Sequence, residues 1–325
     1  EIKDLSVIYK TDLETVKAVN GINIAIKKKS TFGLVGETGA GKTTTARSII
    51  RLLPSVGHVT SGTIEFEDRN LLELPEAEMR LFRGDKIAMV FQDPMTSLNP
   101  VMSVGDQIAE TIKIHNPELD KAEVGRRVEA TLAMVGILPS RKVEYPHQFS
   151  GGMKQRVIIA MALACEPQLL IADEPTTALD VTIQAQVLMM IKDLRDRLGT
   201  SMLMITHDLG IVAKICDDVG IMYAGEIVEA GTVQDIFEGK NHHPYTEGLF
   251  GSIPNLKSKA KRLNAIPGLM PDPTDLPEGC VFAERCKYAM ELCHKVHPSV
   301  ATSGTHQLCC HLFNADGSRK EKNHE

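Results

Sequence analysis

An eight-residue stretch near the start of the chain has the composition of a phosphate-binding loop. Glycine stands first and sixth, and lysine and threonine follow, in Gly36-Glu37-Thr38-Gly39-Ala40-Gly41-Lys42-Thr43. Glycine lets the backbone turn its N–H groups towards an anion. The helix expected to begin near Gly41 adds the positive end of its dipole, and Thr44 in its first turn is also expected to bind the nucleotide. Lys42 would bind the β- and γ-phosphates of a nucleotide, and the Thr43 hydroxyl would bind Mg²⁺. The pattern predicts a nucleoside triphosphate site, against the alternative of a plain glycine turn.

Two adjacent carboxylates could supply the second half of such a site. The apolar run 169–172 is followed directly by Asp173 and Glu174. A strand that ends in this way places both acids at the sheet edge where ligands bind in α/β folds. Asp173 would hold Mg²⁺ through its water shell, and Glu174 would polarise the attacking water. Two acids after a strand more often form a helix cap or a solvated edge, but after a phosphate loop they predict hydrolysis of ATP.

A third stretch connects these motifs to a family. Phe149-Ser150-Gly151-Gly152-Met153-Lys154-Gln155-Arg156 resembles the signature of ATP-binding-cassette (ABC) ATPases. The resemblance covers residues 1 to about 250, and further motifs occur in the expected order. It implies one role for each of four more residues: adenine stacking for Tyr9, sensing of Mg²⁺ and the γ-phosphate for Gln92, a dimer contact for Asp180, and contact with the γ-phosphate for His207.

The signature also implies a partner. Ser150, Gly151 and Gly152 open an expected helix, which would make them a second anion cradle. The resemblance places this cradle against the ATP of another cassette in a head-to-tail dimer, so that one chain alone cannot complete a site. Met153 stands where the family usually has glutamine, and it cannot donate amide hydrogen bonds.

The stretch 91–100, Phe-Gln-Asp-Pro-Met-Thr-Ser-Leu-Asn-Pro, looks like the glutamine loop of oligopeptide and dipeptide importer ATPases, and His243-Pro244-Tyr245-Thr246 resembles the same group. The resemblance implies peptide import at the cytoplasmic face of a prokaryotic plasma membrane. It implies a paralogous second cassette, two transmembrane permease subunits whose coupling helix meets residues 93–106, and an extracytoplasmic peptide-binding protein. Nickel, metal-chelate and glutathione importers share these motifs. Two alternatives to a transporter subunit are a soluble ABC ATPase of DNA repair or translation and an ATP-switched redox or metal sensor.

Five of the seven cysteines lie after residue 279. Their spacing lacks the close Cys-x₂₋₄-Cys chelates of zinc sites and fits a loop around an iron–sulfur cluster at least as well. It resembles the C-terminal extension of peptide-importer ATPases, which implies a 4Fe–4S cluster bound by Cys280, Cys286, Cys293 and Cys310. Cys310 is chosen over Cys309 because the last cysteine of the family's pattern precedes a histidine or similar residue, as Cys310 precedes His311. The alternatives are reduced thiols that fill a small lobe, and Zn²⁺ bound by three cysteines and one histidine, from His294, His297 or His311.

Composition narrows the class further. The 325 residues carry a net charge of −6 with a pI near 6.0, which argues against a general nucleic-acid binder. No apolar run approaches the roughly 20 residues that cross a bilayer, and the first residues show no secretory signal. The sequence also starts without an initiator methionine, as if a few residues had been trimmed. A soluble intracellular protein is therefore expected.

The elements that must position these residues form an α/β pattern. Apolar runs at 22–26, 31–35, 169–172 and 202–205 read as strands, and helical spacing fills 43–53, 124–135, 152–165 and 183–198. Their alternation predicts a largely parallel sheet. The resemblance implies a P-loop NTPase cassette over 1–250, with a RecA-like core, an antiparallel β edge and a helical subdomain at about 94–164. A basic and proline-rich linker then leads into a cysteine-rich extension over 251–325, where little helix or strand is expected.

Overall fold

The computed structural model describes residues 1–92, 97–176, 179–252 and 266–320. The chain divides into two compact units. Unit 1 contains Glu1–Ala25, Gly33–Asn70 and His207–Glu325, and unit 2 contains Ile26–Phe32 and Leu71–Thr206. The expected boundary near residue 250 stays a prediction. Part of the expected glutamine loop, 93–96, and the basic stretch with Lys257, Lys259, Lys261 and Arg262 lie outside the described residues.

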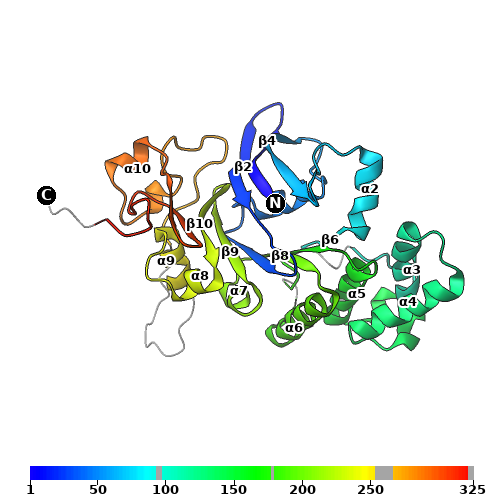
Figure 1. Ribbon diagram of the computed structural model, residues 1–325. Coiled ribbons are helices and arrows are strands. Elements are labelled where there is room, and N and C mark those ends of the chain that lie inside the picture. Colours follow the sequence, from blue (N-terminus) through cyan, green and yellow to red (C-terminus); the bar gives the residue numbers. More distant parts are fainter. Residues whose placement is uncertain (93–96, 177–178, 253–265, 321–325) are drawn as a thin grey trace. The chain divides into compact units, whose positions relative to one another are not determined.

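Unit 1 begins with an antiparallel sheet in the order β2-β1-β4-β5, drawn in blue in Figure 1. The strands are β1 (Ile2–Lys10), β2 (Thr15–Ile24), β4 (Gly57–Phe66) and β5 (Arg69–Asn70). Side chains that point to one face of β1, such as Leu5 and Val7, are fully buried. This sheet is the antiparallel β edge expected of a cassette.

A second sheet of unit 1 joins the phosphate-loop strand to the end of the chain. Its order is β11-β12-β10-β9-β3. The strands are β3 (Thr31–Val35), β9 (Asp218–Tyr223), β10 (Glu226–Thr232), β11 (Val300–Ser303) and β12 (His306–Cys309). The helices of this unit are α1 (Lys42–Ile49), α7 (Leu209–Ile215), α8 (Val233–Glu238), α9 (Pro244–Gly251), η4 (Ala283–Arg285) and α10 (Glu291–Lys295).

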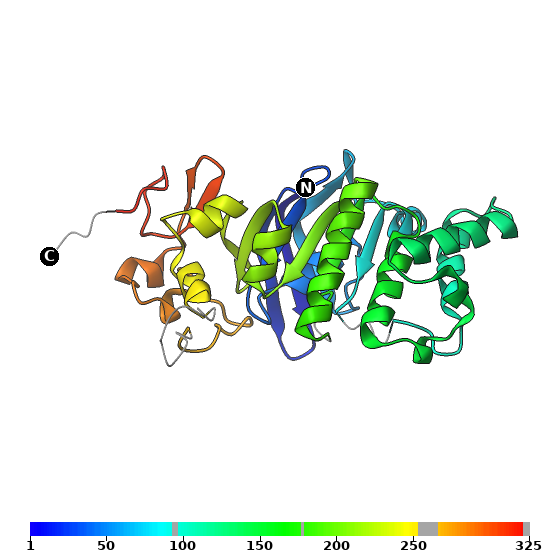
Figure 2. The ribbon, with the colours of Figure 1, turned by 90° about the horizontal axis from the view of Figure 1, so that it is seen from below.

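The C-terminal segment is more regular than its sequence indicates. Strand β12 pairs antiparallel with β10, with Leu308 opposite Glu229, and β11 pairs antiparallel with β12. Figure 2 shows this orange-to-red segment beside the yellow helices α8 and α9. The expectation of little regular structure in the extension is wrong for these strands. Each is only four residues long, too short for alternation to be distinguished from loop sequence.

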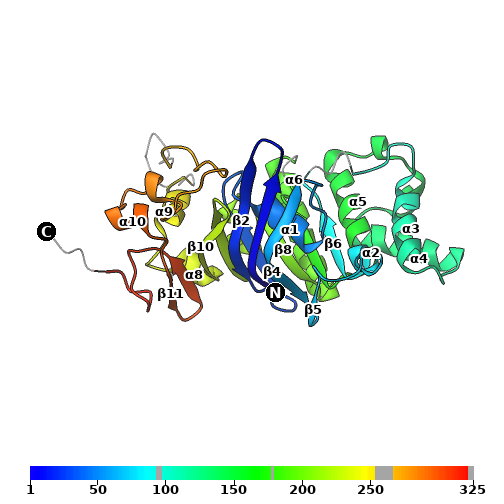
Figure 3. The same ribbon diagram turned by 90° about the horizontal axis from the view of Figure 1, so that it is seen from above.

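Unit 2 is built on the parallel strands β8-β7-β6. They span β6 (Ile87–Val90), β7 (Leu169–Asp173) and β8 (Ser201–Thr206). Every residue of β7 is buried, as expected of a strand covered on both faces. The helices are α2 (Glu76–Asp85), α3 (Val104–His115), α4 (Lys121–Met134), η2 (Pro139–Val143), η3 (Pro146–Gln148), α5 (Gly151–Leu163) and α6 (Val181–Leu198). Figure 3 shows α3, α4 and α5 side by side.

The predicted helices and strands agree with the structure except at their ends. Strand 31–35 coincides with β3, and the helix predicted over 183–198 is α6. The helix predicted to reach residue 53 ends at Ile49, because Arg51 has a φ of 51° and Pro54 follows. Among the described residues, no helix is both long and apolar enough to span a bilayer.

Candidate functional site

The phosphate loop of unit 1 has room only for glycine at two of its positions. A Cβ at Gly36 would lie 2.2 Å from the Met222 carbonyl oxygen, and one at Gly41 would lie 2.4 Å from the Ala18 carbonyl oxygen. Gly41 also has a φ of 105°, which side chains rarely tolerate. The loop therefore passes directly over neighbouring backbone, and its N–H groups are brought to the start of α1.

Lys42 lies at the first turn of α1 with its side chain folded over the loop. It is 6% exposed, and its Nζ donates to the carbonyl oxygens of Gly36 (2.7 Å) and Glu37 (2.9 Å). In the described part of the chain, no side chain caps the start of α1. The N–H groups of that turn and a buried ammonium group therefore form a cationic cradle for phosphate.

Tyr9 lies next to this helix. Its hydroxyl is 3.0 Å from the Thr44 Oγ1 in α1, and its ring lies under Gly57, where a Cβ would approach it to 2.9 Å. The residue is therefore held at the nucleotide-loop helix. Its adenine-stacking role stays a prediction, as do the roles of Thr38, Gly39, Ala40 and Thr43.

Glu37, the second residue of the loop, is held by residues that sequence analysis missed. The Arg285 guanidinium donates to both carboxylate oxygens, at 2.9 and 3.2 Å. The Glu37 N–H donates to the Tyr245 hydroxyl at 3.0 Å, and Arg285 also reaches the Tyr223 hydroxyl at 3.3 Å. Arg285 is 248 residues from its partner, so no local pattern signals the contact.

In unit 2 the two carboxylates occupy the end of β7 as predicted. Asp173 is 1% exposed, whereas Glu174 follows the strand with a φ of 46°, an uncommon conformation for a residue with a side chain. The Glu174 N–H donates to the Ile205 carbonyl at 2.9 Å. The Gln92 Nε2 donates to the Glu174 Oε2 at 3.3 Å. The structure thus brings together two of the three predicted catalytic residues.

The signature residues lie at the start of α5. Ser150 is the N-cap, and its exposed hydroxyl accepts from the Met153 N–H at 3.4 Å. Gly151 and Gly152 form the first turn, and a Cβ at Gly152 would lie 2.5 Å from the Ile183 Cγ2. Met153 has no side-chain amide to donate, and its sulfur instead accepts a hydrogen bond from the Arg141 Nη1 at 3.3 Å. An exposed helix N-terminus with a serine cap suits the expected contact with a partner's phosphate.

The remaining motif residues are exposed at helix starts. Asp180 caps α6 and accepts from the Ile183 N–H at 3.0 Å. His207 is exposed, and the next residue, Asp208, caps α7 and accepts from the Gly210 N–H at 2.7 Å. The roles of Asp180 and His207 stay predictions.

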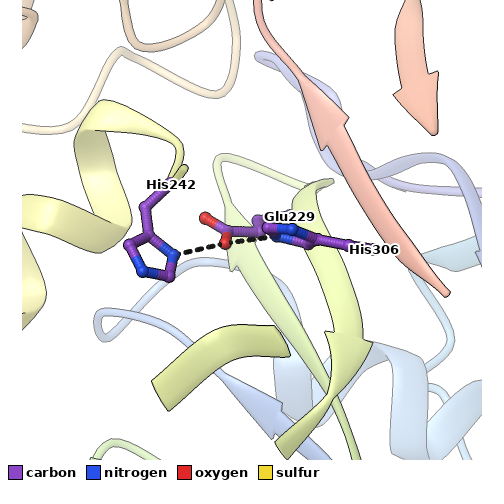
Figure 4. A group of neighbouring side chains, drawn as sticks. All are labelled: Glu229, His242 and His306. Carbon is purple, nitrogen blue, oxygen red and sulfur yellow. Dashed lines mark hydrogen bonds and ion pairs between the residues drawn. The ribbon is translucent and has the colours of Figure 1, made fainter. Parts of the chain in front are cut away.

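A second group in unit 1 was not identified from the sequence. Figure 4 shows the Glu229 carboxylate between the rings of His242 and His306. The Glu229 Oε1 lies 2.9 Å from the His242 Nδ1 and 2.8 Å from the His306 Nε2, and its Oε2 accepts from the His243 N–H at 2.8 Å. Burial alone would raise the pKa of Glu229. The hydrogen bonds from His242 and His306 outweigh that effect and lower the pKa to about 2.

The donor set Glu229, His242 and His306 could hold a metal ion, but hydrogen bonding already accounts for its geometry. The His242 Nε2 faces the Gly239 carbonyl at 2.9 Å while its Nδ1 faces the carboxylate, so both ring nitrogens face acceptors. Such a ring is satisfied as a doubly protonated cation, and the bond to Glu229 raises the pKa of His242. We therefore interpret Glu229 and His242 as an ion pair with a buried carboxylate, and the bond between His306 and Glu229 as the contact that joins β12 to β10.

The C-terminal thiols of Cys309 and Cys310 are both buried, which raises the pKa of each to about 12. The Cys280 N–H donates to the Cys293 carbonyl at 2.7 Å, so the backbones of these two residues are in contact. The Cys309 thiol donates to the Pro298 carbonyl at 3.3 Å.

The histidines near these thiols have partners elsewhere. His297 bonds Glu226 at 2.8 Å, and the His311 Nε2 bonds the Val296 carbonyl at 2.8 Å.

Comparison with known proteins decides the family. A model described as ABC transporter matches residues 19–177, and one described as the C-terminal region of oligopeptide/dipeptide transporters matches residues 228–293. The oligopeptide transport ATP-binding protein OppD of Bacillus subtilis is 48% identical, over 99% of this chain and 90% of that protein. The chain is a member of the ABC transporter family.

Further relatives agree with this assignment. The dipeptide transport ATP-binding protein DppD of Bacillus subtilis is 47% identical over 96% of this chain and 93% of its own length. A dimeric ATP-binding cassette solved in a post-hydrolysis state with ADP and Pi superimposes with a TM-score of 0.64 at 26% identity, over 71% of this chain and 97% of that one. The predicted cassette fold is confirmed, and this ABC cassette is an ATP-binding, ATP-hydrolysing subunit.

Proposed function

We propose that this ABC cassette hydrolyses ATP to drive the import of oligopeptides or dipeptides. The observation that carries the proposal is the match of residues 228–293 to the C-terminal region of oligopeptide/dipeptide transporters, in a chain whose relatives are named as peptide transport proteins over nearly its full length. These matches favour peptide import over import of nickel, metal chelates or glutathione, and over a soluble ABC ATPase.

In this proposal the nucleotide contacts are shared among the motif residues. Lys42 and the N–H groups of the loop and of α1 bind the β- and γ-phosphates, which requires the Lys42 Nζ to leave the Gly36 carbonyl. Thr43 and Asp173 would hold Mg²⁺, which neutralises charge on the phosphate oxygens. Tyr9 stacks on the adenine.

Hydrolysis needs a polarised water molecule. The Glu174 carboxylate would accept a proton from that water, and Gln92, which already contacts Glu174, would bind Mg²⁺ and sense the γ-phosphate. His207 contacts the γ-phosphate as the bond breaks. These three residues are the proposed catalytic groups.

A second cassette completes each site. Ser150, Gly151 and Gly152 of one chain would bind the γ-phosphate held by the other, and Asp180 would lie at the shared interface. Shifting the pair of cassettes from mostly open to mostly closed takes about 5.5 kcal/mol of differential ATP binding. Two γ-phosphate contacts of this charge-assisted kind, one at each site, can provide it. The proposed assembly contains a paralogous cassette, two transmembrane permease subunits and an extracytoplasmic peptide-binding protein, with this chain peripheral on the cytoplasmic face of the membrane.

The C-terminal thiols fit a 4Fe–4S cluster, which is the finer part of the proposal. Cys280, Cys286, Cys293 and Cys310 would be its ligands, because the backbones of Cys280 and Cys293 are in contact and the Cys309 thiol already bonds a carbonyl. Zinc held by three thiolates and one histidine, from His294, His297 or His311, is the alternative that the test below must exclude. Absorbance near about 400 nm after anaerobic purification supports the cluster. A colourless protein with one zinc ion per chain contradicts it.

The ATPase part of the proposal is tested by Glu174→Gln in the complex with its permease subunits. Loss of the proton acceptor should lower turnover at least a hundredfold and trap an ATP-bound dimer. Glu166→Gln, which changes an exposed carboxylate just before β7, is the matched control and should keep normal turnover. Normal turnover in Glu174→Gln would contradict the assigned role.

The transport part is tested by affinity purification with identification of the bound subunits, followed by uptake in vesicles. Peptide uptake that needs ATP and an intact Glu174 supports the proposal. Uptake of nickel or glutathione in place of peptides would contradict it.

A further inference from the structure

The C-terminal segment contacts the phosphate loop and the strand beneath it. Arg285 donates to Glu37, the second residue of the loop. The Met270 methyl carbon lies 3.0 Å from where a Cβ of Gly39 would be. The Lys17 N–H of β2 donates to the Pro273 carbonyl at 2.8 Å. A region outside the nucleotide motifs therefore covers the loop that would bind ATP.

The Arg285 side chain is also held by residues other than Glu37. Its side chain is 6% exposed, and its Nε donates to the Pro267 carbonyl at 2.9 Å. The guanidinium lies 5.6 Å from the centre of the Tyr223 ring. A planar guanidinium held in this way presents a rigid fork, which suits the two-bond contact with a carboxylate.

Glu37 is in turn held through all of its polar groups. Arg285 binds the carboxylate, the Tyr245 hydroxyl accepts the backbone N–H at 3.0 Å, and the Lys42 Nζ donates to the backbone carbonyl at 2.9 Å. The loop conformation at this residue therefore depends on groups from three parts of unit 1.

The charge of Glu37 makes this contact more than structural. A carboxylate in a phosphate-binding loop repels a triphosphate, and at short range in a partly buried site this repulsion is appreciable. Arg285 neutralises that carboxylate, whose side chain is 33% exposed. Without Arg285, ATP would have to bind beside an uncompensated negative charge.

We propose that Arg285 is a positioning residue for ATP binding, through which the C-terminal segment neutralises the negative charge of the phosphate loop. The inference rests on the proposed function only in that the loop binds ATP. Arg285 ends η4, and its guanidinium is held by Glu37, the Tyr223 hydroxyl and the Pro267 carbonyl.

The test measures equilibrium binding of Mg-ATP to the full chain by calorimetry, and KM and kcat in the assembled transporter. Arg285→Gln should raise the Kd and KM for ATP about tenfold, the change that about 1.4 kcal/mol produces, with kcat changed less than twofold. Glu37→Gln should leave the Kd equal or lower it, because it removes the repelling charge. The double variant should bind ATP nearly as well as the unaltered chain.

This sign pattern separates charge compensation from a merely structural contact, which would weaken ATP binding in both single variants. Arg285→Lys keeps the charge without the fork, so its Kd should fall between those of the unaltered chain and Arg285→Gln. It also supplies the comparison if Arg285→Gln does not fold. Lys287→Gln, which removes an exposed cation paired with Glu247 in the same lobe, is the control and should bind ATP normally.

Two results would overturn the inference: an unchanged Kd in folded Arg285→Gln, or Glu37→Gln weakening ATP binding as much as Arg285→Gln does. Failure of the unaltered chain to bind Mg-ATP would instead contradict the proposed function, so the two failures are distinguishable.

Discussion

Two carboxylates of unit 1 are held by the C-terminal segment, and they differ in their partners. Glu37 lies in the phosphate loop, is 33% exposed at its side chain, and binds one guanidinium in a two-bond contact. Glu229 lies in β10, has a fully buried side chain, and accepts from two histidine rings and one backbone N–H. The first contact joins the segment to a nucleotide site, and the second joins it to the sheet.

The partners determine what each contact can respond to. The bonds to Glu37 raise the pKa of Arg285 although burial lowers it, so its charge is constant at any physiological pH. The contact at Glu229 contains His242, whose charge can change near neutral pH. The comparison teaches that the arginine contact can set ATP affinity without pH dependence, while the bond between His242 and Glu229 makes the stability of unit 1 sensitive to pH.

The largest expected effect comes from breaking the buried contact. Glu229→Gln removes the buried anion that accepts from His242 and His306 and leaves the partly buried His242 cation without its counter-charge, which should lower the free energy of unfolding of unit 1 by about 3 kcal/mol. Thermal and chemical denaturation of the full chain would measure this loss.

The matched control is Glu226→Gln. Glu226 also accepts a histidine bond from this segment, but His297 is 48% exposed at its side chain. An exposed pair contributes about 0–1 kcal/mol, so the control should change little. Equal losses in the two variants would mean that burial does not distinguish the two histidine contacts.

A pH series would sharpen the comparison. The pKa of Glu229 is lowered from 4.5 to about 2, so its contribution, on the order of 3 kcal/mol, is present above pH 4.5 and lost as pH falls towards 2. The pKa of His242 is raised above 6.5 by Glu229, so its contribution is complete below pH 6.5 and lost as pH rises through the raised value. The midpoint of thermal unfolding should therefore decline both as pH falls below 4.5 and as pH rises above 6.5.

His242→Gln is the variant that checks the alkaline decline. It should be less stable than the unaltered chain at pH 6 and should lack most of the fall in melting temperature above that pH. The ATP affinity that depends on Arg285 should show no matching change between pH 6 and 8. An alkaline decline of the same size in His242→Gln would assign it to other groups.

The same two contacts show how far sequence reasoning reaches. The phosphate loop, the paired carboxylates and the signature are each contiguous, so local spacing was enough to place Lys42, Glu174 and Ser150 on the right elements. Glu229 and His306 are 77 residues apart, and Arg285 and Glu37 are 248 apart. Each is an ordinary charged or polar residue in its local context, and only the pairing of β12 with β10 and the folding of the lobe over the loop make them partners.

The smallest expected effect concerns the second support of Glu37. Tyr245→Phe removes the hydroxyl that accepts the Glu37 N–H but keeps the buried ring, which lies 4.7 Å from that of Tyr223. A neutral hydrogen bond contributes about 0.5–1.5 kcal/mol, so the Kd for ATP should rise about threefold, less than in Arg285→Gln. Tyr288→Phe, which removes a hydroxyl bonded to Glu247 in the same lobe, is the control and should not change it. A rise as large as that in Arg285→Gln would mean that backbone geometry at Glu37, and not the neutralised carboxylate, limits nucleotide affinity.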